Sequence, residues 1–166
     1  MRTLLMGGAL GVLVISLAAC GGSSASSTSE QAVERQADLY AIGQLEKSFH
    51  KAMSKQDIDL MMSIWAPNAT MTTGPGQTRT GKKQIRSHWL KSTPFQPTTH
   101  WISDTPAYKI RMTVNGDRGT LFFECHFIDT KTSKAVAVSG ADMQVARIDG
   151  DWVVTSMVGA SAALSS

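Results

Sequence analysis

The stretch that decides the fold is AVAVSGADMQVARIDGDWVVTSMVG, residues 135–159. On both sides of Asp149-Gly150 the hydrophobic pattern has a period of two, which is typical of β-strands. An Asp-Gly pair between two such runs is a strong signal for a two-residue hairpin turn. The stretch therefore predicts two long antiparallel strands, 135–148 and 151–159, joined by a tight turn.

The same pattern continues toward the N-terminus. Residues 119–129 predict another strand, and the turn residues at 115–117 predict a hairpin before it. Residues 98–114 form one more strand region, with a bulge or bend at Pro106. One face of the 119–129 strand carries Leu121, Phe123, Cys125 and Phe127. The C-terminal half is therefore predicted to be a meander of antiparallel strands.

The N-terminal half has a helical period. Apolar residues recur every three or four positions and predict a helix over 31–55; they are Leu39, Ile42, Leu45, Phe49 and Met53. A second helix begins near Asp57, whose carboxylate suits an N-cap, runs through Trp65 and is ended by Pro67. A short strand or hairpin over 70–80 and a third helix over 82–90 follow. Helices followed by a strand meander predict one α+β domain, with helices against one face of a curved sheet.

The first twenty residues are typical of a secretory signal. Arg2 precedes an apolar run over 4–17, which is too short for a comfortable membrane span, and small residues follow it. Leu17-Ala18-Ala19-Cys20 resembles the bacterial lipobox, in which the cysteine is acylated and anchors the protein to the bilayer. We therefore expect an extracytoplasmic, membrane-anchored lipoprotein, on the periplasmic side if the host has two membranes.

The local composition divides the chain into four expected segments. Residues 1–19 are the predicted signal peptide, 20–30 a flexible Gly/Ser tether, 31–160 the folded domain and 161–166 a disordered tail. The 16 Lys and Arg against 13 Asp and Glu give a net charge of +3 without a basic stripe, so nucleic acid is not an expected partner. Cys125 is interpreted as a small buried hydrophobe. The spacing of His and Cys predicts no metal site, and no motif predicts a cofactor.

Four motifs, in this order, resemble the nuclear transport factor 2-like (NTF2-like) superfamily, and within it the SnoaL-like, ketosteroid-isomerase-like branch. The motifs lie at residues 54–59, 64–70, 81–85 and 147–152. The resemblance implies a cone in which the sheet curls around the first helix, with a pocket at the open end. It also implies frequent dimerisation through the outer face of the sheet. Because such a fold hosts isomerases, dehydratases and proteins without activity, the pocket residues must decide the function.

The catalytic positions that the resemblance implies are incompletely filled. A ketosteroid isomerase needs a tyrosine, a carboxylate base and a neutral carboxylic acid. These positions fall at Phe49, Thr73 and Asp142, so only the acid is kept. A second pattern of the superfamily pairs a histidine with an aspartate; here His100 stands at the histidine position and Ser54 at the aspartate position. His100 is therefore the best candidate for a pocket base, since histidine titrates near neutrality.

The leading hypothesis is a binding module for a small apolar organic ligand. His100 and Asp142 would orient the ligand, and Phe49, Trp65 and Trp101 would form the walls. Two alternatives stay open: a lyase or isomerase acting on a small carbonyl or polycyclic compound, with His100 as base and Asp142 as acid, and a non-catalytic homodimerisation or assembly module. The remaining histidines are predicted to face solvent (His50, His88) or the outer face of the sheet (His126).

Overall fold

The computed structural model describes residues 23–103 and 107–163. The helices are α1 (Ser23–Lys55), α2 (Ile58–Ser63), α3 (Gly81–Trp89) and the 3-10 turn η1 (Thr93–Phe95). The strands are β1 (Trp65–Thr72), β2 (Thr78–Thr80), β3 (Trp101–Ser103), β4 (Lys109–Asn115), β5 (Arg118–Asp129), β6 (Lys134–Ile148) and β7 (Asp151–Ala163). The predicted signal peptide and Cys20 lie outside the described residues.

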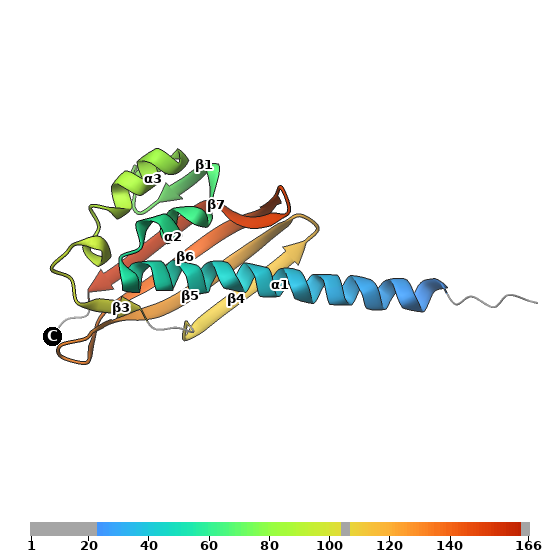
Figure 1. Ribbon diagram of the computed structural model, residues 1–166, viewed down its shortest axis with the longest axis horizontal. Coiled ribbons are helices and arrows are strands. Elements are labelled where there is room, and N and C mark those ends of the chain that lie inside the picture. The colour runs from blue at the N-terminus through green and yellow to red at the C-terminus, as the bar shows by residue number, and fades with distance from the viewer. Residues whose placement is uncertain (1–22, 104–106, 164–166) are drawn as a thin grey trace, which may run out of the picture.

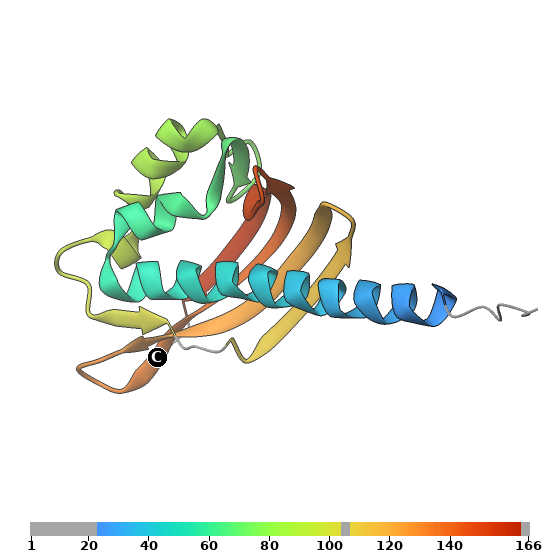
Figure 2. The same ribbon diagram turned by 45° about the vertical axis from the view of Figure 1, so that its right-hand side comes forward.

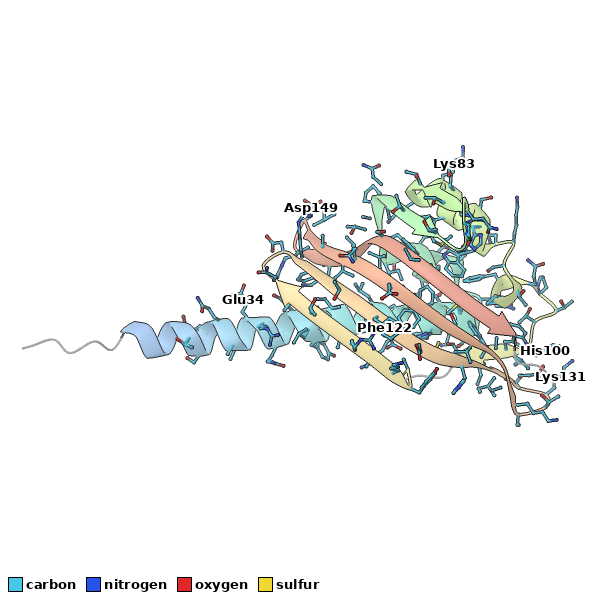
Figure 3. All side chains as sticks on the ribbon, turned by 180° about the vertical axis from the view of Figure 1, so that it is seen from behind. Glu34, Lys83, His100, Phe122, Lys131 and Asp149 are labelled. Carbon is cyan, nitrogen blue, oxygen red and sulfur yellow. The ribbon has the colours of Figure 1, made fainter. Side chains whose placement is uncertain are left out.

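The strands form a single curved sheet in the order β2-β1-β7-β6-β5-β3, with β4 also paired to β5. All neighbours are antiparallel except β1 and β7, which run parallel. The helices lie on one side of the sheet, with α1 across its concave face (Figure 1). Figure 3, seen from behind, shows the opposite face of the sheet without a covering helix. The predicted α+β class and the mostly antiparallel curved sheet are confirmed.

The hairpin between β6 and β7 is the one predicted from Asp149-Gly150. Both turn residues have positive φ, 53° for Asp149 and 91° for Gly150, as a type I′ turn requires. The inward-facing side chains of the two strands form one side of the core; they are Ala137, Ala141, Met143, Val145, Trp152, Val154 and Met157. Strand β7 continues to Ala163, so residues 161–163 are part of the sheet and not of a disordered tail.

Helix α1 is longer than predicted, since it includes residues 23–30 of the expected tether. Ser and Ala fit a helix tolerably, and extending a helix that is already anchored gains one hydrogen bond for each residue fixed. Residues 28–37 are exposed, and continuous burial against the sheet begins beyond them, near Asp38. In Figure 2 this exposed part of α1 extends beyond the edge of the sheet. Among the described helices, none is both long and apolar enough to cross a membrane.

Helix α2 begins as predicted and ends sooner. The Asp57 carboxylate accepts a hydrogen bond from the Leu60 N–H at 2.9 Å, which is an N-cap. Trp65 was expected at the helix end but starts β1, where it pairs with Val154. The Ile64 carbonyl already accepts from the Val154 N–H at 2.8 Å, so pairing with β7 replaces the last helical turn. Pro67 lies where the β1–β7 register shifts, a position that needs no ladder donor.

Candidate functional site

A cavity of about 410 Å³ opens between α1, α3, the η1 segment and the sheet. Its size is within the range of about 300–1,000 Å³ that is usual for small-molecule pockets. Most of its wall is apolar, and the larger apolar side chains there are Phe49, Met53, Trp89, Trp101, Phe127 and Met157. The Trp101 and Phe127 rings pack at 5.7 Å between centroids, and the Phe49 and Trp89 rings at 5.5 Å. Aromatic pairs therefore form two sides of the cavity.

Two of the three predicted walls line this cavity. Phe49 reaches it from the C-terminal half of α1, and Trp101 from the start of β3. Trp65 does not line it. That ring is 1% exposed in the core, where β1 pairs with β7, so the residue belongs to the core that supports the sheet. Its move from the expected helix end to a strand explains the difference.

The two predicted polar residues, His100 and Asp142, are not brought together. Asp142 alternates with the buried Ala141 and Met143, so its exposed side chain lies on the outer face of the sheet, beside Phe122 of β5. That placement corrects the expectation of a pocket acid. His100 is exposed just before β3, and its carbonyl accepts from the Thr130 N–H at 2.9 Å. Figure 3 shows His100 beside Lys131 at one end of the sheet, and neither predicted residue lines the cavity.

The polar part of the cavity comes mainly from α3 and the turn after it. His88 and Lys91 line it, together with the hydroxyl groups of Thr73, Ser92 and Ser139. His88 was expected to face solvent, but its ring is partly buried. Burial, and to a smaller extent the nearby Arg79 charge, lower the pKa of His88 below its ordinary value. The imidazole is therefore held in its neutral form at the cavity wall.

Sequence reasoning missed a buried polar cluster in the core. His50 Nδ1 lies 2.5 Å from Glu46 Oε1, and His50 Nε2 lies 2.8 Å from Cys125 Sγ. The Ser103 hydroxyl contacts the same sulfur at 3.3 Å, and the Ala107 N–H donates to Glu46 Oε1 at 3.3 Å. His50 and Cys125 are 0% exposed and Glu46 is 1% exposed. The prediction that His50 faces solvent is wrong, and Cys125 is more than a small hydrophobe.

The spacing of α1 contains the signal that would have found this cluster. Glu46 and His50 are four residues apart, and both lie on the stripe that carries Ile42, Phe49 and Met53 into the core. The order acid, histidine, thiol is that of a nucleophilic triad. A nucleophile must reach its substrate, however, and Cys125 is fully buried and does not line the cavity. The arrangement joins α1 to β5 within the core.

Metal binding has no support within residues 23–103 and 107–163. No group of three or more His, Cys, Asp or Glu side chains there is arranged to hold an ion. In the buried cluster, His50 stands between its two partners, so the three groups bond in a row and do not surround a common point. The cavity is therefore the site whose shape and access suit a ligand.

The curved sheet, the helix across its concave face and the cavity at one end define an NTF2-like, cystatin-like protein. A family model for the SnoaL-like domain matches residues 45–155, and the chain belongs to that family. The matched segment contains most of the residues that line the cavity. The comparison with curated proteins found no match to the sequence.

Solved structures share the fold at low sequence identity. An NTF2-like protein with a cystatin-like fold from Novosphingobium aromaticivorans has a TM-score of 0.68 at 14% identity, covering 84% of this chain and 91% of that chain. A protein of unknown function with a cystatin-like fold from Nostoc punctiforme has a TM-score of 0.66 at 15% identity, covering 75% and 91%. A type 2 hexachlorocyclohexane dehydrochlorinase has a TM-score of 0.64 at 18% identity, covering 81% and 93%.

Proposed function

We propose that this protein binds a small, largely apolar organic molecule in the cavity between α1, α3 and the sheet. The observation that carries the proposal is the wall itself, in which two aromatic pairs and two methionines line a cavity of about 410 Å³ whose polar residues lie mainly on α3 and the turn after it. Burial of apolar ligand surface against such a wall contributes roughly 25 cal/mol per Å² before the costs of association.

The proposal includes attachment to a membrane on the extracytoplasmic side. Its support is the sequence of residues 17–20, in which small residues lead to Cys20. Acylation there would tether the domain through the N-terminal end of α1, leaving the cavity exposed to the surrounding medium. Homodimerisation through the outer face of the sheet is part of the same proposal, and its support is the exposed apolar side chain of Val158 on that face.

The positions of His100 and Asp142 do not support catalysis by these two residues. The two groups lie outside the cavity, and Asp142 faces away from it, so they share no reacting atom. A binding role needs only the cavity.

The proposed binding site can be tested by filling the cavity with a larger side chain from its own wall. Ala137 is buried in its wall, whereas Ala135, two residues earlier on the same strand, is exposed and does not line it. Native mass spectrometry would detect a molecule retained through purification and count subunits, and calorimetry would measure the binding of decanol. We expect Ala137→Phe to weaken decanol binding by about tenfold or more and Ala135→Phe to leave it unchanged. Wild-type protein that retains nothing and does not bind decanol would contradict the proposal.

A further inference from the structure

The cavity has a positively charged rim. His88 and Lys91 line both the apolar cavity and an adjoining groove, and the groove is completed by Arg79, Lys83, Gln84 and Ser87. Arg79 reaches the cavity edge, because its Nη1 donates to the hydroxyl of Thr73, a cavity residue, at 3.0 Å. Figure 3 shows Lys83 at α3, on the side of the helix away from the sheet. Basic groups therefore follow α3 and β2 to the mouth of the cavity.

Among the residues that the structure describes, no carboxylate at the cavity or the groove neutralises this charge. Arg79 donates to neutral oxygens only, the Thr73 hydroxyl and the Gln77 carbonyl at 2.8 Å. The described carboxylate that pairs with α3 is Asp59, 3.7 Å from Arg86, and Arg86 lines neither the cavity nor the groove. A positive rim without a counter-ion attracts an anion.

His88 does not add to this positive charge near neutral pH. Its pKa is lowered by burial first and by the Arg79 guanidinium second, so the neutral ring offers one donor and one acceptor. The basic side chains at the mouth are then Arg79 and Lys91. A carboxylate is one of the anionic groups that a guanidinium and an ammonium bind with charge-assisted hydrogen bonds.

We propose that the ligand is an amphipathic organic acid, with its apolar body in the cavity and its carboxylate at the rim between Arg79 and Lys91. This inference rests on the proposed function and adds the chemical class of the ligand. The aromatic and methionine wall accounts for the apolar body, and the uncompensated cations account for the head group. Ser92 and Thr93, beside Lys91, also line this side of the cavity.

The experiment compares two probes with the same chain, decanoate and decanol, by calorimetry on the full-length protein and three variants. Arg79→Gln and Lys91→Gln remove the two rim charges. The control is Arg118→Gln, which removes an exposed charge at the far end of β5. We expect the wild type to bind decanoate roughly tenfold or more tightly than decanol. Each rim variant should lose most of that preference for decanoate over decanol, and the control should resemble the wild type.

The dependence of binding on salt concentration is an independent test of the rim charges. Raising the ionic strength from about 0.05 M to about 0.5 M should weaken decanoate binding and leave decanol binding nearly unchanged. If decanol binds as tightly as decanoate, or if Arg118→Gln acts like the rim variants, the inference is overturned while the proposed function stands. If neither probe binds, the inference and the proposed function both fail.

Discussion

His50 Nε2 lies 2.8 Å from Cys125 Sγ, so the core face of α1 is hydrogen-bonded directly to β5. The other ring nitrogen contacts Glu46, one turn earlier on the same helix. Three polar groups are thus buried together, and each depends on the others to replace lost hydration.

Replacing His50 should therefore strongly destabilise the folded protein. His50→Leu leaves the Glu46 carboxyl buried with only the Ala107 N–H, at 3.3 Å, among its described partners. We expect the free energy of unfolding to fall by about 3–5 kcal/mol in urea denaturation. Lys51→Leu, an exposed neighbour on the same helix, is the control and should change it by less than about 0.5 kcal/mol. The double variant Glu46→Met/His50→Leu should recover part of the loss; a single variant as stable as the wild type would contradict this account.

A second cluster anchors α1 nearer its exposed end. The Asp38 carboxylate accepts from Arg147 Nη2 at 2.6 Å and from Trp152 Nε1 at 3.1 Å, which ties α1 to the β6–β7 hairpin. Asp38→Ala should lower the free energy of unfolding by about 2 kcal/mol, because two partly buried donors lose their acceptor. Glu34→Ala, one turn earlier and exposed, should have an effect of less than about 0.5 kcal/mol. Equal effects of the two changes would show that Asp38 is not an anchor.

Alanine substitution should change the stability of the protein in opposite directions at two glycines. A Cβ at Gly119 would lie 2.4 Å from the Thr113 carbonyl oxygen and close to Ile42 and Val145, so the backbones must separate. Gly119→Ala should lower the melting temperature, with a cost of about 1–3 kcal/mol. A Cβ at Gly43, inside α1, would meet Met112 Sδ at an ordinary 3.6 Å. Gly43→Ala should raise stability by about 0.5–1 kcal/mol, and a loss there would contradict the packing described.

His88 should make stability depend on pH. Its pKa in the folded protein is below the ordinary value of 6.5, because of burial and then the Arg79 charge. The unfolded chain therefore binds a proton before the folded protein does, and stability decreases as the pH falls below about 6.5. Between pH 8 and pH 5 the wild type should lose more stability than His88→Gln, measured by urea denaturation at each pH. NMR titration should show a higher His88 pKa in Arg79→Gln; identical pH slopes for His88→Gln and wild type would refute the assignment.

The long periodic segments were predictable because their patterns depend on local geometry. The strands predicted at 119–129, 135–148 and 151–159, the N-cap at Asp57 and the hairpin at Asp149-Gly150 follow from the period of the side chains and from turn chemistry. The end of α2 was not predictable in this way. Trp65 belongs to a strand because of its pairing with Val154, a partner distant in sequence. Local propensity does not contain such a contact.

Predicting the site required knowledge of which faces meet. Phe49 and Trp101, named from the resemblance, line the cavity, and His88 and Lys91 line it because α3 and the turn after it fold back over the sheet. Asp142 is different, since the alternation of Ala141 and Met143 already placed it on the outer face. His50 was assigned from its polar neighbours in sequence, although its spacing from Glu46 placed both on the core stripe of the helix.

Helix α1 is one continuous helix, but one part of it is packed against the domain and the other part is in solvent. From Asp38 onward it is held by the ion pair with Arg147 and by the buried bonds of His50, whereas residues 28–37 are surrounded by solvent. Amide protons in the exposed part should exchange with solvent through local fraying, and those beyond Asp38 only when the whole domain opens. Cleavage by a protease within the exposed turns would then shorten the helix without releasing the domain from its native state.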